Sequence, residues 1–239
     1  MGRIFEKRKD RMFARWAKTA KAFTKLGKEI AISVKLSGPD PDNNPRLRMA
    51  IQTARSLNMP KDRIEAAIKR ASSRDEADLA EISYEGFAPH GVGLFVETAT
   101  DNATRTVANV RNIITKHGGN LATTGALEYI FDRKGVFKIG MPKGDLDEFE
   151  LEMIDHGLEE IFETEDGLLL YSSFKQFGDL QKALEARGIE VKSAAPQRIP
   201  SNYIKVSAEQ EAEIQKLIDR LEEDDDVQSV FHNMQSEAD

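Results

Sequence analysis

The stretch RMFARWAKTAKAFTKLGKEIAISVKLS, residues 11–37, decides how the beginning of this chain folds. Its apolar residues recur with the 3.6-residue period of an α-helix, so we predict one long helix with two unlike faces. The apolar face carries Phe13, Trp16, Ala20, Phe23, Ile30 and Val34. The opposite face carries Arg11, Lys18, Lys21, Lys25, Lys28 and Lys35. Such a helix suits a polyanion, although lysines that only keep a helix soluble give the same pattern.

Charge is divided unevenly along the chain. The first 75 of the 239 residues hold 19 Lys and Arg against 8 Asp and Glu, a net charge of +11. The remaining residues hold 15 basic and 33 acidic side chains, a net charge of −18. This asymmetry indicates a basic module for an anionic partner, joined to an acidic body. The alternative is that the two parts neutralise each other across an internal interface.

Two shorter helices are predicted after the long one. A turn-rich connector, SGPDPDNNPR at residues 37–46, leads into a helix that Asn44 caps and Pro45 begins. The next helix has the same i, i+3, i+4, i+7 apolar spacing and ends at about Ala71. We therefore predict a basic three-helix domain over residues 1–75.

After residue 82 the apolar residues follow the pattern of β-strands. ISYEGFA and VGLFVETAT are predicted as two strands, followed by a helix that Asn102 caps, and ALEYIF at residues 126–131 is predicted as a third. The end of the chain has a possible strand YIKV, a helix with a capping box in Ser207 and Gln210, and a strand VQSVFH. Because neither segment is complete alone, we predict that both belong to one discontinuous domain.

The segment between these two parts has a different order of strands and helices. Its predicted order is βαββαβ, with the second and third strands joined by the turn at residues 165–167. This order is ferredoxin-like. Pro196 and Pro200 are predicted to bracket a linker that returns to the discontinuous domain. The predicted fold is thus α+β and multi-domain. It has an N-terminal three-helix domain at 1–75 and a discontinuous α+β domain at 76–132 plus 201–239. A second α+β domain, at 133–200, is inserted in the discontinuous one.

No pattern of residues indicates catalysis or a bound cofactor. The four histidines have no metal-ligand spacing, and there is no cysteine. Nucleotide-binding glycine loops and the GxSxG nucleophile motif do not occur. The acidic run Asp224–Asp226 is expected to be a solvated loop, with a weak cation site as the alternative. We therefore expect no metal, no cofactor, no small-molecule substrate and no enzymatic activity.

The sequence also bears on location. No apolar run approaches the ~20 residues that span a bilayer, and the first residues lack the apolar core of a secretory signal. We expect a cytoplasmic protein that does not contact membranes.

Several motifs resemble the YebC/PmpR family. FTKLGKEI and VKLSGPDPDNNPRLRMAI are similar to its beginning, as is NMPKDRIEAAIKRA. YEGFAPHGVGLFVETATDNATRTVANVRNIITKHGGNL is similar to its middle, and LIDRLEEDDDVQSVFHN to its end. Residues 1–22 depart from the usual Gly-His-Ser-Lys-Trp beginning, which only Trp16, Lys18 and Lys21 echo. The resemblance implies three domains, one helical and two α+β, and a non-enzymatic role that involves nucleic acid.

Two hypotheses follow about function. The first is a nucleic-acid-binding regulator: the resemblance implies a probable transcriptional regulator that binds DNA, or a ribosome-associated translation factor that binds ribosomal RNA. The second is an adaptor whose acidic α+β body binds a basic protein. Under the first, phosphates contact cations of the helical domain, which give affinity but little sequence specificity. The expected contacts are Arg11, Arg15, Lys18, Lys21, Lys25, Lys28 and Lys35, with Arg46, Arg48, Lys61 and Arg63 flanking.

Overall fold

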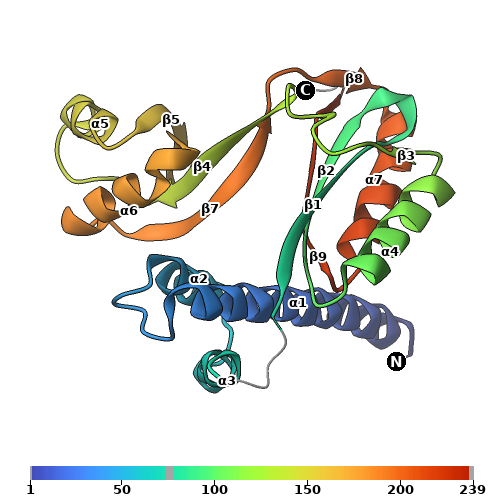
Figure 1. Cartoon of the computed structure of the whole chain (residues 1–239), viewed down its shortest axis with the longest axis horizontal. Coiled ribbons are helices and arrows are strands. Elements are labelled where there is room, and N and C mark those ends of the chain that lie inside the picture. Colours follow the sequence, from blue (N-terminus) through green and yellow to red (C-terminus); the bar gives the residue numbers. More distant parts are fainter. Residues whose placement is uncertain (1, 74–77, 237–239) are drawn as a thin grey trace.

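The computed structural model describes the backbone of residues 2–73 and 78–236, and the side chains of these residues from Thr19 onward. Figure 1 shows three groups of elements. The helical unit, α1–α3, lies along the bottom of the view. The central unit, with β1, β2, β9, α4 and α7, lies above one end of α1. The inserted unit, with β4–β7, α5 and α6, extends to the other side.

Three helices make up the helical unit, namely α1 (Gly2–Ser37), α2 (Pro45–Ser56) and α3 (Lys61–Ala71). α1 begins earlier than the predicted start at residue 11. The three helices share one apolar core, as their 3.6-residue periodicity predicts. Its buried members are Ile30, Val34, Leu47, Ala50, Ile51, Ala54, Met59, Ile64 and Ala71.

Asn44 joins the end of α1 to the start of α2. Its side-chain oxygen accepts a hydrogen bond from the Leu47 amide at 3.0 Å, as a helix cap does. Its amide nitrogen donates to the carbonyls of Ser33 and Gly38, at 2.7 and 2.8 Å. One buried side chain thus satisfies backbone groups at both helix ends, which would otherwise be unpaired.

The central unit combines segments from both sides of the insertion. Its sheet has the spatial order β3 (Asn120–Leu121), β1 (Ala80–Phe87), β2 (Gly93–Thr100) and β9 (Val227–His232). β1 and β2 form a hairpin across the short helix η1 (Pro89–Gly91), and β9 pairs antiparallel with β2. α4 (Ala103–Lys116) and α7 (Ala208–Glu222) cover one face of this sheet (Figure 1). β8 (Ile204–Val206) and β10 (Met234–Ser236) form a separate parallel pair.

The strand predicted at residues 126–131 is wrong. Residues 124–130 form turns, and β4 begins only at Phe131. The turns are held by the buried carboxylate of Glu85, which accepts hydrogen bonds from the amides of Gly125 at 2.7 Å and Leu127 at 2.6 Å. The apolar residues there pack in a small cluster around Phe95. A tertiary contact has therefore overridden local β-propensity.

The inserted unit has the predicted ferredoxin-like order. Along the chain it consists of β4 (Phe131–Ile139), α5 (Leu146–Ile154), β5 (Leu158–Thr164), β6 (Gly167–Ser173), η2 (Phe174–Gln176), α6 (Phe177–Ala186) and β7 (Val191–Pro200). The strands lie in the spatial order β5-β6-β4-β7, all antiparallel to their neighbours. We retain the three-domain division as a proposal, and three large clusters of buried residues, one in each unit, support it.

The predicted linker between Pro196 and Pro200 is wrong, because both prolines lie within β7. β7 is an edge strand, paired on one side with β4. An edge strand tolerates proline because the outward-facing backbone positions need no N–H donor. The insertion therefore continues in strand form to Pro200, opposite Phe131 at the start of β4.

Replacing Asn44 with Ala tests the junction between α1 and α2. We expect the free energy of unfolding to fall by about 2–3 kcal/mol, because a cap and two buried acceptors lose their partner. Urea unfolding followed by the fluorescence of Trp16, the single tryptophan, measures the change. Asn43→Ala is the matched control: Asn43 is exposed, so a loss below about 0.5 kcal/mol is expected. Equal losses in the two variants would contradict the assignment.

Candidate nucleic-acid interface

Lysines on one face of α1 contact the central unit. Lys21 Nζ donates to the carbonyl oxygen of Glu223 at 3.1 Å, and Lys25 Nζ donates to that of Gln228 at 3.3 Å. These carbonyls belong to residues 223–228, the acidic segment, which follows the C-terminal end of α7. The last turn of a helix carries partial negative charge, which favours an ammonium group there.

Lys28 makes more hydrogen bonds across this contact than Lys21 or Lys25 does. Its ammonium group donates to the carbonyl oxygens of Ala99 at 2.9 Å and Asp225 at 2.8 Å. It also forms an ion pair with Asp226 Oδ1 at 2.8 Å, where the two side chains are only 19% and 8% exposed. All three donor positions of the ammonium are thus used across the contact.

The Asp226 carboxylate is held from several elements. Its Oδ2 accepts from Arg105 Nη2 at 2.8 Å, from the Thr106 hydroxyl at 2.9 Å and from the Thr100 hydroxyl at 3.2 Å. Burial alone would raise the pKa of Asp226. The hydrogen bonds from Lys28, Arg105 and Thr106 outweigh burial and lower the pKa to about 2. The predicted solvated loop is therefore wrong at Asp226, where the bound cation is the ammonium of Lys28.

Arg46 links the helical unit to the central sheet. Its guanidinium contacts Glu29 on α1 and Glu81 on β1, with shortest N–O distances of 2.7 and 2.6 Å. Burial would lower the pKa of Arg46, but the hydrogen bonds to both carboxylates raise it. Lys35 forms an ion pair with Asp78 at 3.2 Å. These cations therefore join the helical unit to the acidic part of the chain.

The contact with the inserted unit is of a different kind. Arg48 forms an ion pair with Glu185 at 3.0 Å and donates to the carbonyl of Pro41 at 2.9 Å. Met49 is 5% exposed and belongs to the apolar core of the inserted unit. Gln52 donates to the carbonyl of Val191 on β7. α2 therefore packs on the inserted unit through apolar contact as well as charge.

These contacts show that the predicted exposed row of cations on α1 is wrong at several positions. The sequence suggested one exposed row of cations on α1, but the lysines at 21, 25 and 28 face the central unit. The alternative interpretation, that basic and acidic parts neutralise each other across an internal interface, fits them better. The side chains of Arg11, Arg15 and Lys18 lie outside the described residues.

A second group of cations on α2 and α3 is exposed. Within the part of the chain whose side chains are described, four of them have no hydrogen bond or ion pair from their guanidinium or ammonium groups: Arg55, Arg63, Lys69 and Arg70. Lys61 is exposed and forms an ion pair with Glu65 on the same helix, at 3.5 Å. In Figure 1, α3 lies on the side of α1 away from both sheet units. Lys61 and Arg63 were among the predicted phosphate contacts, whereas Arg55, Lys69 and Arg70 were not, although Lys69 and Arg70 lie outside the apolar spacing of the predicted third helix.

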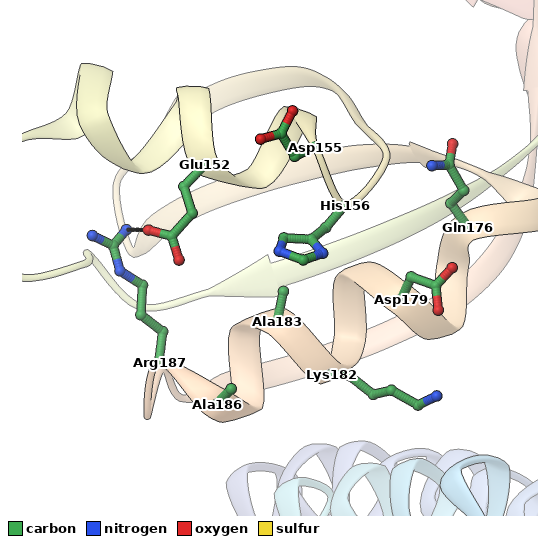
Figure 2. Close-up of a pocket in the computed structure, with 9 residues that line it drawn as sticks. All are labelled: Glu152, Asp155, His156, Gln176, Asp179, Lys182, Ala183, Ala186 and Arg187. Atoms are coloured by element: carbon green, nitrogen blue, oxygen red, sulfur yellow. Dashed lines mark ion pairs between the residues drawn. The ribbon is translucent and has the colours of Figure 1, made fainter.

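The open pocket between α5 and α6 does not assemble a catalytic site (Figure 2). Its lining mixes acidic and basic residues over a floor of Ala183 and Ala186. Glu152 and Arg187 pair with each other at 3.2 Å, while Asp155 points away from the His156 ring. Among the residues that the structure describes, no group of three or more His, Asp or Glu could hold a metal ion. No helix in that part of the chain has the length and apolar character to cross a membrane.

Comparison with protein families accounts for almost the whole chain. Residues 3–74 match the model of the TACO1/YebC protein N-terminal domain, and residues 79–234 match that of the TACO1/YebC second and third domain. The chain belongs to the TACO1/YebC family. The resemblance in its sequence motifs is thereby confirmed.

Other members of the TACO1/YebC family are similar over their full length. A protein of Porphyromonas gingivalis is 53% identical over 99% of this chain and 98% of its own. One from Flavobacterium johnsoniae is 50% identical over 99% of this chain and 100% of its own. Both are named probable transcriptional regulatory protein. The crystal structure of a conserved hypothetical protein from Aquifex aeolicus superposes with a TM-score of 0.77 at 36% identity, covering 91% of this chain and 90% of that one.

The lowered pKa of Asp226 predicts a pH-dependent contribution to stability. Its ordinary pKa is 3.8, so the contribution is present above about pH 4 and is lost as the pH falls toward 2. We expect Asp226→Asn to lower the free energy of unfolding by about 2–3 kcal/mol at pH 7, and by less as the pH approaches 2. Urea unfolding across this pH range measures it.

Asp225→Asn is the matched control for this experiment. Asp225 contributes a carbonyl oxygen to the contact with Lys28, and its side chain is exposed. Its replacement should change stability by less than about 0.5 kcal/mol at any pH. A difference between wild type and Asp226→Asn that stayed constant from pH 7 to pH 2 would contradict the role given to the Asp226 charge.

Proposed function

We propose that this protein of the TACO1/YebC family is a non-enzymatic regulator of gene expression that binds DNA through its helical unit. The observation that carries the proposal is the exposed group of cations on α2 and α3, namely Arg55, Lys61, Arg63, Lys69 and Arg70. The names of its relatives, probable transcriptional regulatory proteins, agree with this role.

The exposed cations suit phosphates better than bases. They are long side chains on the outer surface of two short helices, and no described hydrogen bond or ion pair fixes the direction of Arg55, Arg63, Lys69 or Arg70. Such contacts neutralise the backbone of a nucleic acid and release its counterions, so affinity falls steeply with salt. They add little sequence specificity. Arg11, Arg15 and Lys18 stay in the proposal as expected phosphate contacts, on the basis of sequence alone.

Structured RNA is the alternative ligand, because a phosphate-binding surface does not discriminate by itself between DNA and a ribosomal RNA. Sedimentation of the endogenous protein in a sucrose gradient separates the two. Comigration with ribosomal subunits at low salt supports a translation factor, and absence from these fractions supports a transcriptional regulator. The adaptor hypothesis is less well supported, since Glu81, Glu185 and Asp226 of the acidic body already pair with the helical unit.

Removing the four unpaired cations tests the proposed surface. We expect the variant Arg55→Ala, Arg63→Ala, Lys69→Ala, Arg70→Ala to lose affinity for DNA duplexes of any sequence. The slope of log K against log salt should become shallower by about 0.9 for each phosphate contact that is lost. Fluorescence anisotropy with a labelled 24-base-pair duplex, from 50 to 300 mM salt, measures both quantities.

The matched control removes four exposed lysines from the acidic body, which gives the same change in net charge. These are Lys143, Lys175, Lys182 and Lys205. The control should keep the wild-type slope within about one unit. Indistinguishable affinities and slopes for the two quadruple variants would show that net charge alone governs binding, and the α2–α3 surface would be excluded.

A further inference from the structure

The described contacts between α1 and the acidic segment are hydrogen bonds and one ion pair. Among the residues whose side chains the structure describes, the apolar core of the helical unit contains no residue of the central unit, and the core of the central unit contains no residue of α1 from Thr19 onward. What joins them here is the set of ammonium groups at 21, 25 and 28 and the oxygen atoms opposite them. Contacts between charged and polar groups of this kind weaken as the salt concentration rises.

The oxygen atoms that face the lysines resemble those of a phosphodiester chain. Carbonyl oxygens of Glu223, Asp225 and Gln228 and the carboxylate of Asp226 meet the ammonium groups in succession along α1. Most of them carry only the partial charge of a carbonyl, whereas every phosphate of a nucleic acid carries a full negative charge. A polyanion therefore offers each lysine a stronger partner than the acidic segment does.

The partial burial of Lys25 also indicates that a polyanion would be a better partner than the acidic segment. Lys25 is half-buried, and its ammonium group donates to a carbonyl oxygen. Burial lowers the pKa of Lys25, the negative charge of Glu222 raises it in part, and the positive charge of Lys21 lowers it further. A buried ammonium that lacks a directly bonded carboxylate is not in its best environment. The ammonium group of Lys28 has a carboxylate partner in Asp226, so Lys28 contributes most to holding the acidic segment on α1.

We propose that Lys21, Lys25 and Lys28 form a second phosphate-binding surface, which the acidic segment covers in the closed arrangement and which a nucleic acid exposes by displacing that segment. This inference rests on the proposed function for the identity of the ligand. The outward cations of α2 and α3 make the first contact, and the α1 lysines add contacts once the central unit has moved. Binding and domain opening are thereby coupled.

Fluorescence energy transfer on the full chain tests the coupling. The chain has no cysteine, so Ala66→Cys on α3 and Ala212→Cys on α7 give unique labels at exposed positions of the two units. We expect a 24-base-pair DNA duplex to lower the transfer efficiency, with the same midpoint as binding measured by anisotropy. Raising NaCl from 50 to 500 mM without DNA should lower it as well. Binding of DNA with unchanged transfer would overturn the proposal.

Heparin serves as a polyanion that is not a nucleic acid, and it separates this inference from the proposed function. If DNA fails to bind but heparin lowers the transfer, the lysine surface is supported and the DNA ligand is wrong. If DNA and heparin both leave the transfer unchanged, the covered surface is excluded, whatever binds elsewhere.

A pair of charge variants in α7 and the acidic segment gives an independent test. Glu222→Gln with Asp225→Asn weakens the field around the α1 lysines without touching the hydrogen bonds of Asp226. This variant should bind the duplex about two- to threefold more tightly. Glu209→Gln with Glu211→Gln makes the same change in net charge at the far end of α7 and should bind like wild type. Equal increases in affinity would overturn the proposal, because they would reflect net charge only.

Discussion

The ion pair between Lys28 and Asp226 is the constraint on which the contact between α1 and the acidic segment of the central unit depends. It places a charge from the basic part of the chain against a nearly buried charge from the acidic part. Burying a carboxylate is costly unless it is paired and hydrogen-bonded. Here Arg105, Thr100 and Thr106 complete its coordination. The charge asymmetry of the sequence thus has a structural role inside the molecule.

The same contact divides the basic residues of the helical unit into two groups. Lysines on one face of α1 are bound by the central unit, and Arg46 and Arg48 of α2 form ion pairs, while Arg55 and the cations of α3 remain exposed. The structure therefore separates cations that bind other parts of the chain from cations that are exposed. A count of basic residues cannot make this distinction, which depends on where the acidic segment lies after folding.

Local features of the fold were predictable from sequence because they depend on near neighbours. Asn44 and Pro45 begin α2 as expected, and the capping box of Ser207 and Gln210 begins α7. The ferredoxin-like order of the inserted unit follows from the alternation of two periods, 2.0 for strands and 3.6 for helices. Family motifs extended the prediction to almost the full chain, and the family models confirmed it.

Features that depend on distant residues were not predictable. The apolar run at residues 126–131 looks like a strand until the buried carboxylate of Glu85, far away in sequence, is seen to hold it in turns. Pro196 looks like a linker residue until β7 is known to be an edge strand. Asp226 looks solvated in a run of acidic residues, and only the fold brings Lys28 to it. In each case a contact with residues distant in sequence determined the local structure, which the local sequence did not determine.

The most direct measurement of the central claim is a double-mutant cycle on the free energy of unfolding, with Lys28→Met, Asp226→Asn and the double variant. A direct, desolvated interaction predicts a coupling energy of about 1–3 kcal/mol, so that the second substitution costs much less once the first is present. Additive effects, within about 0.3 kcal/mol, would contradict the account, because they would mean that the two charges do not hold the helical and central units together.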